Sequence, residues 1–172
     1  REAFAAGQTA FGENYVQEAV DKMAELRDLP LQWHCIGPIQ SNKTRLVAQH
    51  FDWAHTIDRL RIAQRLNDQR PLGMEPLQVC VQVNTDGGPT KSGVAPEDLP
   101  AFLELYPDVR GLMTMPPATG DPEASRPYFR RLLELAEVYE LPELSMGTIQ
   151  DDAVAAEEGA TLVRLGSVLW QG

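Results

Sequence analysis

The last two apolar strand patterns of the chain each end in small residues that can bind an anion. One pattern ends in Ser145-Met146-Gly147, and the other ends in Gly166-Ser167. Glycine allows the backbone to approach a bound group closely, and a serine hydroxyl donates a hydrogen bond. In parallel β/α barrels the last two loops often hold a phosphate through such donors. The two strand ends therefore predict a phosphate cradle, unless their small residues only terminate the strands.

Arg164 is a charged residue within the apolar strand pattern Thr161–Ser167. Because it stands two positions before Gly166, its side chain is expected on the same strand face. A charged side chain inside a barrel needs a partner, so Arg164 either pairs with a carboxylate, such as Glu13, or faces a ligand. Asn14 also stands at a strand end, where its amide can meet a ligand or cap a turn. Both side chains are candidate binding groups.

Strand patterns and amphipathic helix patterns alternate along the chain and would position these residues. Helical spacing is clearest at Phe129, Leu132 and Ala136. Ser41 and Asp58 are expected to cap the helices that follow them. The expected strands are Phe11–Asn14, Trp33–Gly37, Trp53–Ile57, Leu77–Asn84, Val109–Met115, Leu144–Gly147 and Thr161–Ser167.

Seven strand-helix units predict an α/β protein with a parallel sheet covered by helices. Eight such units close a TIM-type β/α barrel of ~250 residues, whereas this chain has 172. We therefore expect one incomplete β/α barrel domain over residues 1–172 that lacks its first strand. The chain starts at Arg1 without an initiator methionine, so N-terminal truncation is also expected. The two open strand edges of such a barrel would favour self-association.

Composition argues against several classes of function. The formal net charge of −10, from 15 basic and 25 acidic residues, does not suit binding to nucleic acid or an anionic membrane. The sequence shows neither a ~20-residue apolar run nor a signal peptide pattern, which predicts a cytoplasmic protein. Cys35 and Cys80 lie in apolar strand patterns, so buried thiols are expected. The histidines His34, His50 and His55 lack metal-ligand spacing, so a metal site is not expected.

Six motifs, in this order along nearly the whole chain, resemble the pyridoxal-phosphate homeostasis proteins. They are FGENYVQE from Phe11, WHCIGPIQSNK from Trp33, HTID from His55, KSG from Lys91, RGLMTM from Arg110 and VRLGS from Val163. That family resembles the N-terminal barrel of alanine racemase standing alone. The resemblance implies a cytosolic, mostly monomeric barrel that binds pyridoxal 5′-phosphate (PLP). It implies that the protein buffers PLP or delivers it in transient contacts to PLP-dependent apo-enzymes, without robust catalysis.

The resemblance also implies roles for the candidate residues. Ser145, Gly166 and Ser167 would hold the phosphate, Arg164 would face the pyridine nitrogen, and Asn14 would lie beside the ring. An arginine side chain can only donate hydrogen bonds, so it tends to keep the ring nitrogen unprotonated and weakens PLP as an electron sink. Carrier function or racemase-like chemistry is therefore favoured over transamination, and no catalytic residue is assigned.

Two departures from the family pattern affect this prediction. The family's Schiff-base lysine ends the first barrel strand, and none of the lysines Lys22, Lys43 and Lys91 occupies that position. In the family, the Ser-Met-Gly motif is followed by Met-Ser-Asp-Asp. In this chain Gly147 is followed by Thr148-Ile149-Gln150-Asp151-Asp152, so Thr148 would supply the hydroxyl of the missing serine. The alternatives are a racemase-like PLP enzyme and a barrel that binds phosphate non-covalently.

Overall fold

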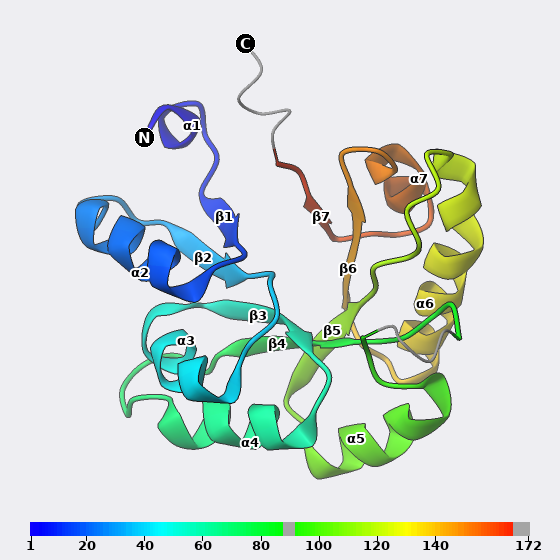
Figure 1. The fold of residues 1–172 in the computed structure, drawn as a ribbon, viewed down its shortest axis with the longest axis horizontal. Helices are drawn as coiled ribbons and strands as arrows, with labels where there is room; N and C mark the ends of the chain where they lie inside the picture. The colour runs from blue at the N-terminus through cyan, green and yellow to red at the C-terminus, as the bar shows by residue number, and fades with distance from the viewer. Residues whose placement is uncertain (88–91, 167–172) are drawn as a thin grey trace. The chain divides into compact units, whose positions relative to one another are not determined.

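The computed structural model describes residues 1–87 and 92–166, and the chain divides into two compact units, Arg1–Val79 and Cys80–Gly172. Ser167 and Lys91 therefore lie outside the described residues. The described residues contain seven strands that alternate with helices along the chain (Figure 1). In each unit, the paired strands are parallel and consecutive in sequence. The predicted strand positions are confirmed, with ends that differ by a few residues.

The first unit consists of short parallel strands and the helices that connect them. Its elements are α1 (Glu2–Ala5), β1 (Ala10–Glu13), α2 (Val16–Glu25), β2 (Gln32–Cys35), the 3-10 helix η1 (Ser41–Lys43), α3 (Thr44–His50), β3 (Trp53–Ile57) and α4 (Leu60–Gln69). Helix α3 packs against both α2 and α4. Val47, Ile62 and Leu66 are buried on these helices, so their apolar stripes form the core of the unit.

Two helix starts in the first unit differ from the prediction. Gln40, not Ser41, is the N-cap residue of η1, and Arg59, not Asp58, is the N-cap residue of α4. Neither N-cap residue makes a capping hydrogen bond through its side chain. At the other end of α3, free backbone carbonyls receive hydrogen bonds from the Arg70 side chain. Arg70 donates to the carbonyl of Ala48 at 2.8 Å and to that of Phe51 at 2.6 Å.

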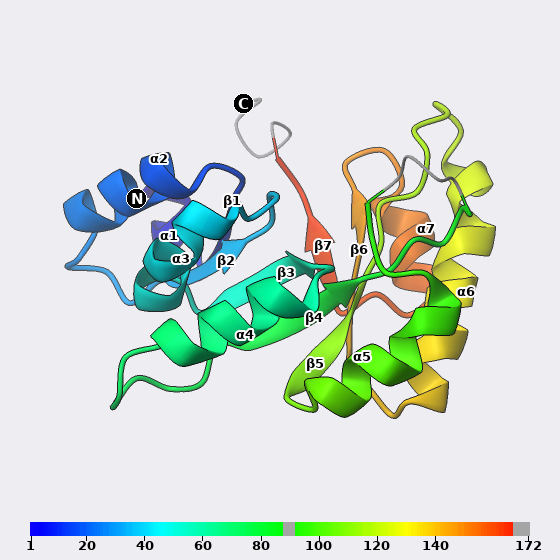
Figure 2. The ribbon, with the colours of Figure 1, turned by 60° about the horizontal axis from the view of Figure 1, so that its bottom comes forward.

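The second unit carries most of the predicted site. Its elements are β4 (Gln78–Gln82), which begins at the end of the first unit, η2 (Pro96–Asp98), α5 (Leu99–Leu105), β5 (Val109–Met113), η3 (Pro122–Ser125), α6 (Arg126–Val138), β6 (Glu143–Thr148), α7 (Asp152–Glu157) and β7 (Leu162–Arg164). Helices α6 and α7 lie beside each other and both contact β6 (Figure 2).

Helix α6 shows how the sequence pattern builds this unit. Its buried residues are Phe129, Leu132 and Ala136, which are the apolar stripe predicted from helical spacing. Burying a side chain of the size of Phe129 contributes about 1.5–3 kcal/mol to folding. The stripe holds α6 against β5 and β6, so the loop between β5 and α6 starts and ends on fixed elements. None of the described helices is both long and apolar enough to cross a membrane.

Both cysteines fit the expectation from their strand patterns. Cys35 in β2 and Cys80 in β4 are fully buried and carry free thiols. Burial raises the pKa of the Cys35 thiol to about 11 and that of the Cys80 thiol to about 12. Both thiols are therefore neutral at physiological pH and behave as small apolar groups in the core.

Candidate functional site

Arg164 and Ser145 meet in the second unit, where β6 and β7 pair. Nη1 of Arg164 donates to Oγ of Ser145 at 2.7 Å, and Nη2 donates to the carbonyl oxygen of Thr114 at 3.0 Å. Ser145 is fully buried within β6. Glu13, the carboxylate considered as a partner of Arg164, instead accepts from Nζ of Lys22 at 2.8 Å in the first unit. Three strand ends of the second unit thus converge on the guanidinium group.

The guanidinium of Arg164 provides a permanent positive charge in this part of the unit. Burial lowers the pKa of Arg164 to about 10, and the charge of the nearby Asp151 carboxylate opposes that shift. A pKa of about 10 leaves the group protonated at neutral pH. The side chain can therefore only donate hydrogen bonds, so it favours a ligand that offers an acceptor or a negative charge.

A cavity of about 150 Å³ opens beside Arg164. Its walls are two segments of the second unit. One is residues 115–122 with Ser125, after β5, and the other is residues 147–151, which begin with the last two residues of β6 and in which all but Ile149 line the cavity. Figures 1 and 2 both show these loops next to each other. The carboxyl ends of parallel strands are the usual place for a binding site in β/α barrels, and the cavity lies at such ends.

Gly147 lies near the end of β6 and has a backbone conformation that glycine adopts readily. Its φ angle is 101°, which side chains rarely tolerate, and an added Cβ would come within 2.6 Å of Cβ of Ala155 in α7. The residue is buried and its backbone lines the cavity. Glycine at this position therefore serves two purposes, because it permits the positive φ angle and lets the strand end approach α7 closely.

The next residue, Thr148, is engaged by a carboxylate of its own loop. The backbone N–H of Thr148 donates to Oδ1 of Asp151 at 2.8 Å, and the Thr148 hydroxyl donates to the same oxygen at 3.4 Å. Asp151 lines the cavity together with Thr148 and Arg164. Oδ1 of Asp151 thus accepts from the N–H and the hydroxyl of Thr148, which are donors that an anionic ligand would otherwise use.

The pairing of β6 with β7 is irregular at the cavity. Ser145 pairs with Leu162 and Thr148 pairs with Arg164, so β6 has one more residue than β7 between these pairs. This irregularity is a β-bulge in β6. Bulges occur next to binding sites because they redirect side chains at a strand end.

The remaining candidates are placed as follows. Gly166 is exposed shortly after β7, and a Cβ added there would meet no atom of the described residues within 4 Å. Asn14 is exposed at the end of β1 in the first unit, where its backbone packs against Gly37. Of the candidates, Ser145, Gly147 and Arg164 are therefore brought together in the second unit, and the loop of Gly166 continues from Arg164.

Thr114 and Asp151 were missed as site residues by sequence reasoning. The Thr114 hydroxyl is buried and lies 2.8 Å from the Thr85 hydroxyl. The carbonyl of Thr114 accepts from Arg164. Thr114 could have been noticed as a hydroxyl residue within an apolar strand pattern, which is the signal that identified Arg164.

A second buried polar cluster occurs in the first unit. Nδ1 of His34 lies 2.8 Å from Nε2 of His55, and Nε2 of His34 lies 2.9 Å from Oε1 of Gln32. With Gln32 as an acceptor, His34 carries its proton on Nε2 and accepts from His55. The His34 ring stacks on Trp53 with a centroid distance of 5.2 Å. Burial lowers the pKa of His34 to about 4, so the imidazole is neutral at physiological pH.

Comparisons with known proteins agree on one family. The sequence model of the family "Alanine racemase, N-terminal domain" matches residues 1–172. A pyridoxal phosphate homeostasis protein of Pseudomonas aeruginosa is 55% identical over 177 residues, an alignment that covers 99% of this chain and 77% of that protein.

Solved structures give the same answer for the fold. PipY of Synechococcus elongatus PCC7942, solved without PLP, superposes with a TM-score of 0.88 and 43% identity, covering 98% of this chain and 85% of PipY. The structure of PipY with PLP bound gives a TM-score of 0.85 and 41% identity, over 98% of this chain and 84% of PipY. The predicted α/β fold class, a TIM-type β/α barrel like that of alanine racemase, is confirmed by this likeness. The chain belongs to the alanine racemase N-terminal domain family and, within it, to the pyridoxal phosphate homeostasis proteins.

Proposed function

We propose that this protein binds PLP and takes part in intracellular PLP homeostasis as a carrier or buffer without robust catalysis. The observation that carries the proposal is that Arg164, whose guanidinium donates to the Ser145 hydroxyl, lines one cavity together with Gly147. The name of the Pseudomonas aeruginosa relative and the PLP-bound structure of PipY support the choice of ligand.

The residues around the cavity fit the chemistry of PLP. PLP combines a phosphate dianion with a pyridine ring whose nitrogen can accept a hydrogen bond, and it supplies an aldehyde for reaction with amines. Arg164 is a protonated donor suited to the ring nitrogen. The strand ends at Ser145 and Gly147, with Gly166 and Ser167 following β7, would surround the phosphate with backbone and hydroxyl donors. In this proposal Asn14 lies beside the ring.

Arg164 argues against transamination, which leaves a carrier or racemase-like chemistry, and of these we propose the carrier. An arginine at the pyridine nitrogen leaves that nitrogen unprotonated, so the ring withdraws electrons weakly and stabilises a carbanion poorly. Arg164 is held in place by Ser145 and Thr114, so its donor atoms are fixed in direction. The naming of relatives as homeostasis proteins agrees with this assignment.

The proposal also covers where the protein is located, how its domain is organised and which proteins it meets. We place it in the cytoplasm, as a single incomplete β/α barrel domain over residues 1–172 that meets PLP-dependent apo-enzymes transiently. The family is expected to be mostly monomeric, whereas the open strand edges of this chain would favour self-association. The net charge of −10 fits a protein without affinity for nucleic acid or anionic membranes.

Equilibrium dialysis with PLP tests the proposal directly. We expect saturable binding of one PLP per chain, and we expect Arg164→Gln to weaken binding at least roughly tenfold, because it removes a charge-assisted donor. Arg131→Gln, which changes an exposed arginine of α6, serves as the matched control and should bind as the original chain does. Absence of saturable binding to the original chain would overturn the proposal.

Two further measurements separate carrier function from the alternatives. Borohydride treatment of the PLP complex, followed by peptide mapping, detects a lysine bound covalently to PLP, and non-covalent binding leaves every lysine unlabelled. Incubation with L-alanine and separation of the enantiomers measures racemisation. Sustained turnover in that assay would replace the carrier assignment with a racemase-like one.

A further inference from the structure

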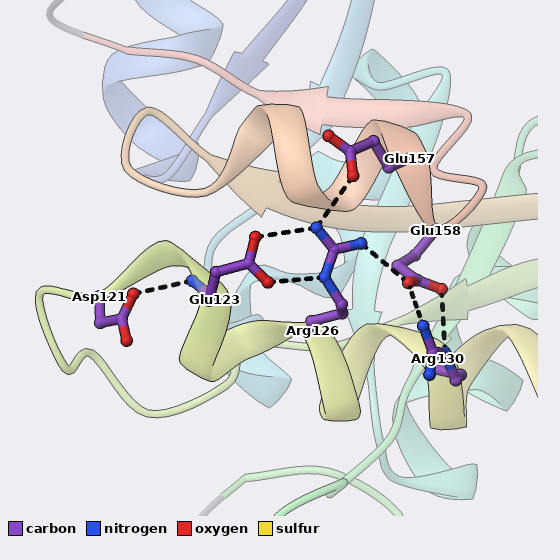
Figure 3. Close-up of polar contacts among 6 residues, drawn as sticks. All are labelled: Asp121, Glu123, Arg126, Arg130, Glu157 and Glu158. Atoms are coloured by element: carbon purple, nitrogen blue, oxygen red, sulfur yellow. Dashed lines mark hydrogen bonds and ion pairs between the residues drawn. The ribbon is translucent and has the colours of Figure 1, made fainter.

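An ion cluster joins helix α6 to helix α7 just behind the two loops that line the cavity. Arg126 donates to both carboxylate oxygens of Glu123, at 2.7 and 2.9 Å, from Nε and Nη2. It also donates to Glu157 at 2.9 Å and to Glu158 at 3.0 Å. Arg130 shares Glu158, with Nη2 at 2.8 Å from its Oε1 atom. Figure 3 shows Arg126 at the centre of these contacts.

The ion cluster connects the helical elements that come after the two cavity walls in the sequence. Glu123 belongs to η3, which begins at the last residue of the wall of residues 115–122, and Arg126 is the first residue of α6. Glu157 and Glu158 stand at the end of α7, the helix that follows the wall of residues 147–151. The backbone N–H of Glu123 additionally donates to Oδ1 of Asp121, a residue of the first wall, at 3.0 Å. One arginine therefore ties the elements that carry both walls.

The connection between η3, α6 and α7 depends on the positive charge of Arg126. Glu123, Glu157 and Glu158 all point at its guanidinium, and Glu158 is only 9% exposed. Without the guanidinium, three carboxylates on facing elements would repel one another, and Arg130 would remain to compensate only Glu158. The planar fork of arginine serves several carboxylates at once, which a lysine cannot do to the same extent.

We propose that Arg126 is a positioning residue for PLP, because it clamps the two loops between which the cavity lies. Arg126 does not itself line this cavity, so its effect on the ligand would act through the loops. This inference rests on the proposed PLP-binding function and adds that the affinity for PLP depends on a cluster outside the binding site.

Arg126→Gln tests the inference through two readouts. We expect the dissociation constant for PLP in equilibrium dialysis to rise roughly tenfold, a change of the size caused by residues that act on a site without touching its ligand. We also expect faster amide hydrogen exchange in residues 115–122 and 147–151 of the ligand-free protein, with exchange in β5 unchanged. Arg126→Lys should recover part of the affinity, a recovery that a general loss of folding would not give.

Two matched variants complete the test. Arg131→Gln changes an exposed arginine of the same helix and should leave both readouts unchanged. Glu157→Gln removes a single tie to α7 and should shift both readouts in the same direction by a smaller amount, even if Arg126→Gln does not fold.

The possible results are distinguishable. If the original chain binds PLP and both Arg126→Gln and Glu157→Gln bind it equally well, the inference is wrong and the proposed function stands. If the original chain shows no saturable binding, the proposed function fails. In that case amide hydrogen exchange in residues 115–122 and 147–151 still tests the clamp. Unchanged exchange in Arg126→Gln and Glu157→Gln would show that Arg126 is not a clamp, whereas faster exchange would support the clamp.

Discussion

The guanidinium of Arg164 and the hydroxyl of Ser145, 2.7 Å apart, form one hydrogen-bonded unit across two neighbouring strands. Ser145 is fully buried, and Met113 of β5 pairs with it on the other side. The direction of the arginine donors is therefore set by three strands rather than by one side chain. This relationship makes the region testable through stability as well as through binding.

Arg164→Lys should destabilise the protein even though it keeps the positive charge. A lysine cannot donate to Ser145 and to the Thr114 carbonyl in the same fork geometry, so a partly buried acceptor loses its partner. Leaving such a group unsatisfied costs about 1–3 kcal/mol. Urea unfolding followed by circular dichroism measures the change, and a free energy of unfolding equal to that of the original chain would contradict it.

Asp151→Asn should strengthen PLP binding about threefold to tenfold. The substitution removes a negative charge from the cavity wall, where it would repel a phosphate, while the asparagine oxygen can still accept from the Thr148 N–H. The stability should change by no more than about 0.5 kcal/mol. Equilibrium dialysis at low and high salt checks the effect, which should shrink at high salt.

Gly147→Ala should be strongly destabilising. The new Cβ would sit 2.6 Å from Cβ of Ala155, and the φ angle of 101° is unfavourable for alanine. Strain and overpacking together predict a loss of about 2–4 kcal/mol. The double variant Gly147→Ala with Ala155→Gly removes the clash but keeps the backbone strain, so it should recover only part of the stability. Full recovery would show that the φ angle is unimportant.

Acid should destabilise the first unit through His34. Its pKa is about 4 in the folded protein and about 6.5 when unfolded, so the unfolded state takes up a proton first as the pH falls. The contribution of neutral His34 is therefore complete above pH 6.5 and is lost as the pH falls from 6.5 towards 4. At about 1.36 kcal/mol per pKa unit, the loss approaches 3 kcal/mol.

Unfolding curves at a series of pH values check this dependence. His34→Gln keeps hydrogen-bonding capacity but does not titrate, so its stability should vary less between pH 7 and pH 5 than that of the original chain. His50→Gln changes an exposed histidine at the end of α3 and is the matched control. Equal pH dependence in the original chain and His34→Gln would rule out His34 as the cause.

The fold could be predicted from the sequence because it depends on local periodicity. The strand Trp53–Ile57 was predicted to the residue, and the stripe of Phe129, Leu132 and Ala136 marked α6 correctly. The N-caps at Ser41 and Asp58 were wrong because a suitable residue type does not fix the local backbone geometry.

Parts of the site could be predicted and other parts could not. Arg164 was identifiable as a charge in an apolar strand, but its acceptor at Thr114 is a backbone carbonyl, which sequence does not distinguish from any other. The pairing of His34 with His55 depends on the register between β2 and β3. The contact of Thr148 with Asp151 depends on the bulge in β6, which leaves no recognisable signal in the residue pattern.

That bulge also determines which side chains share a face. In a regular strand, Ser145 and Thr148 would point to opposite sides, because side chains alternate and three positions separate them. The extra residue resets the alternation, so both hydroxyl residues stand opposite Leu162 and Arg164, which lie on one face of β7. The number of residues between Ser145 and Thr148 is thus a determinant of chemistry, because the same three-position separation in a strand without the bulge would turn the two hydroxyls to opposite faces.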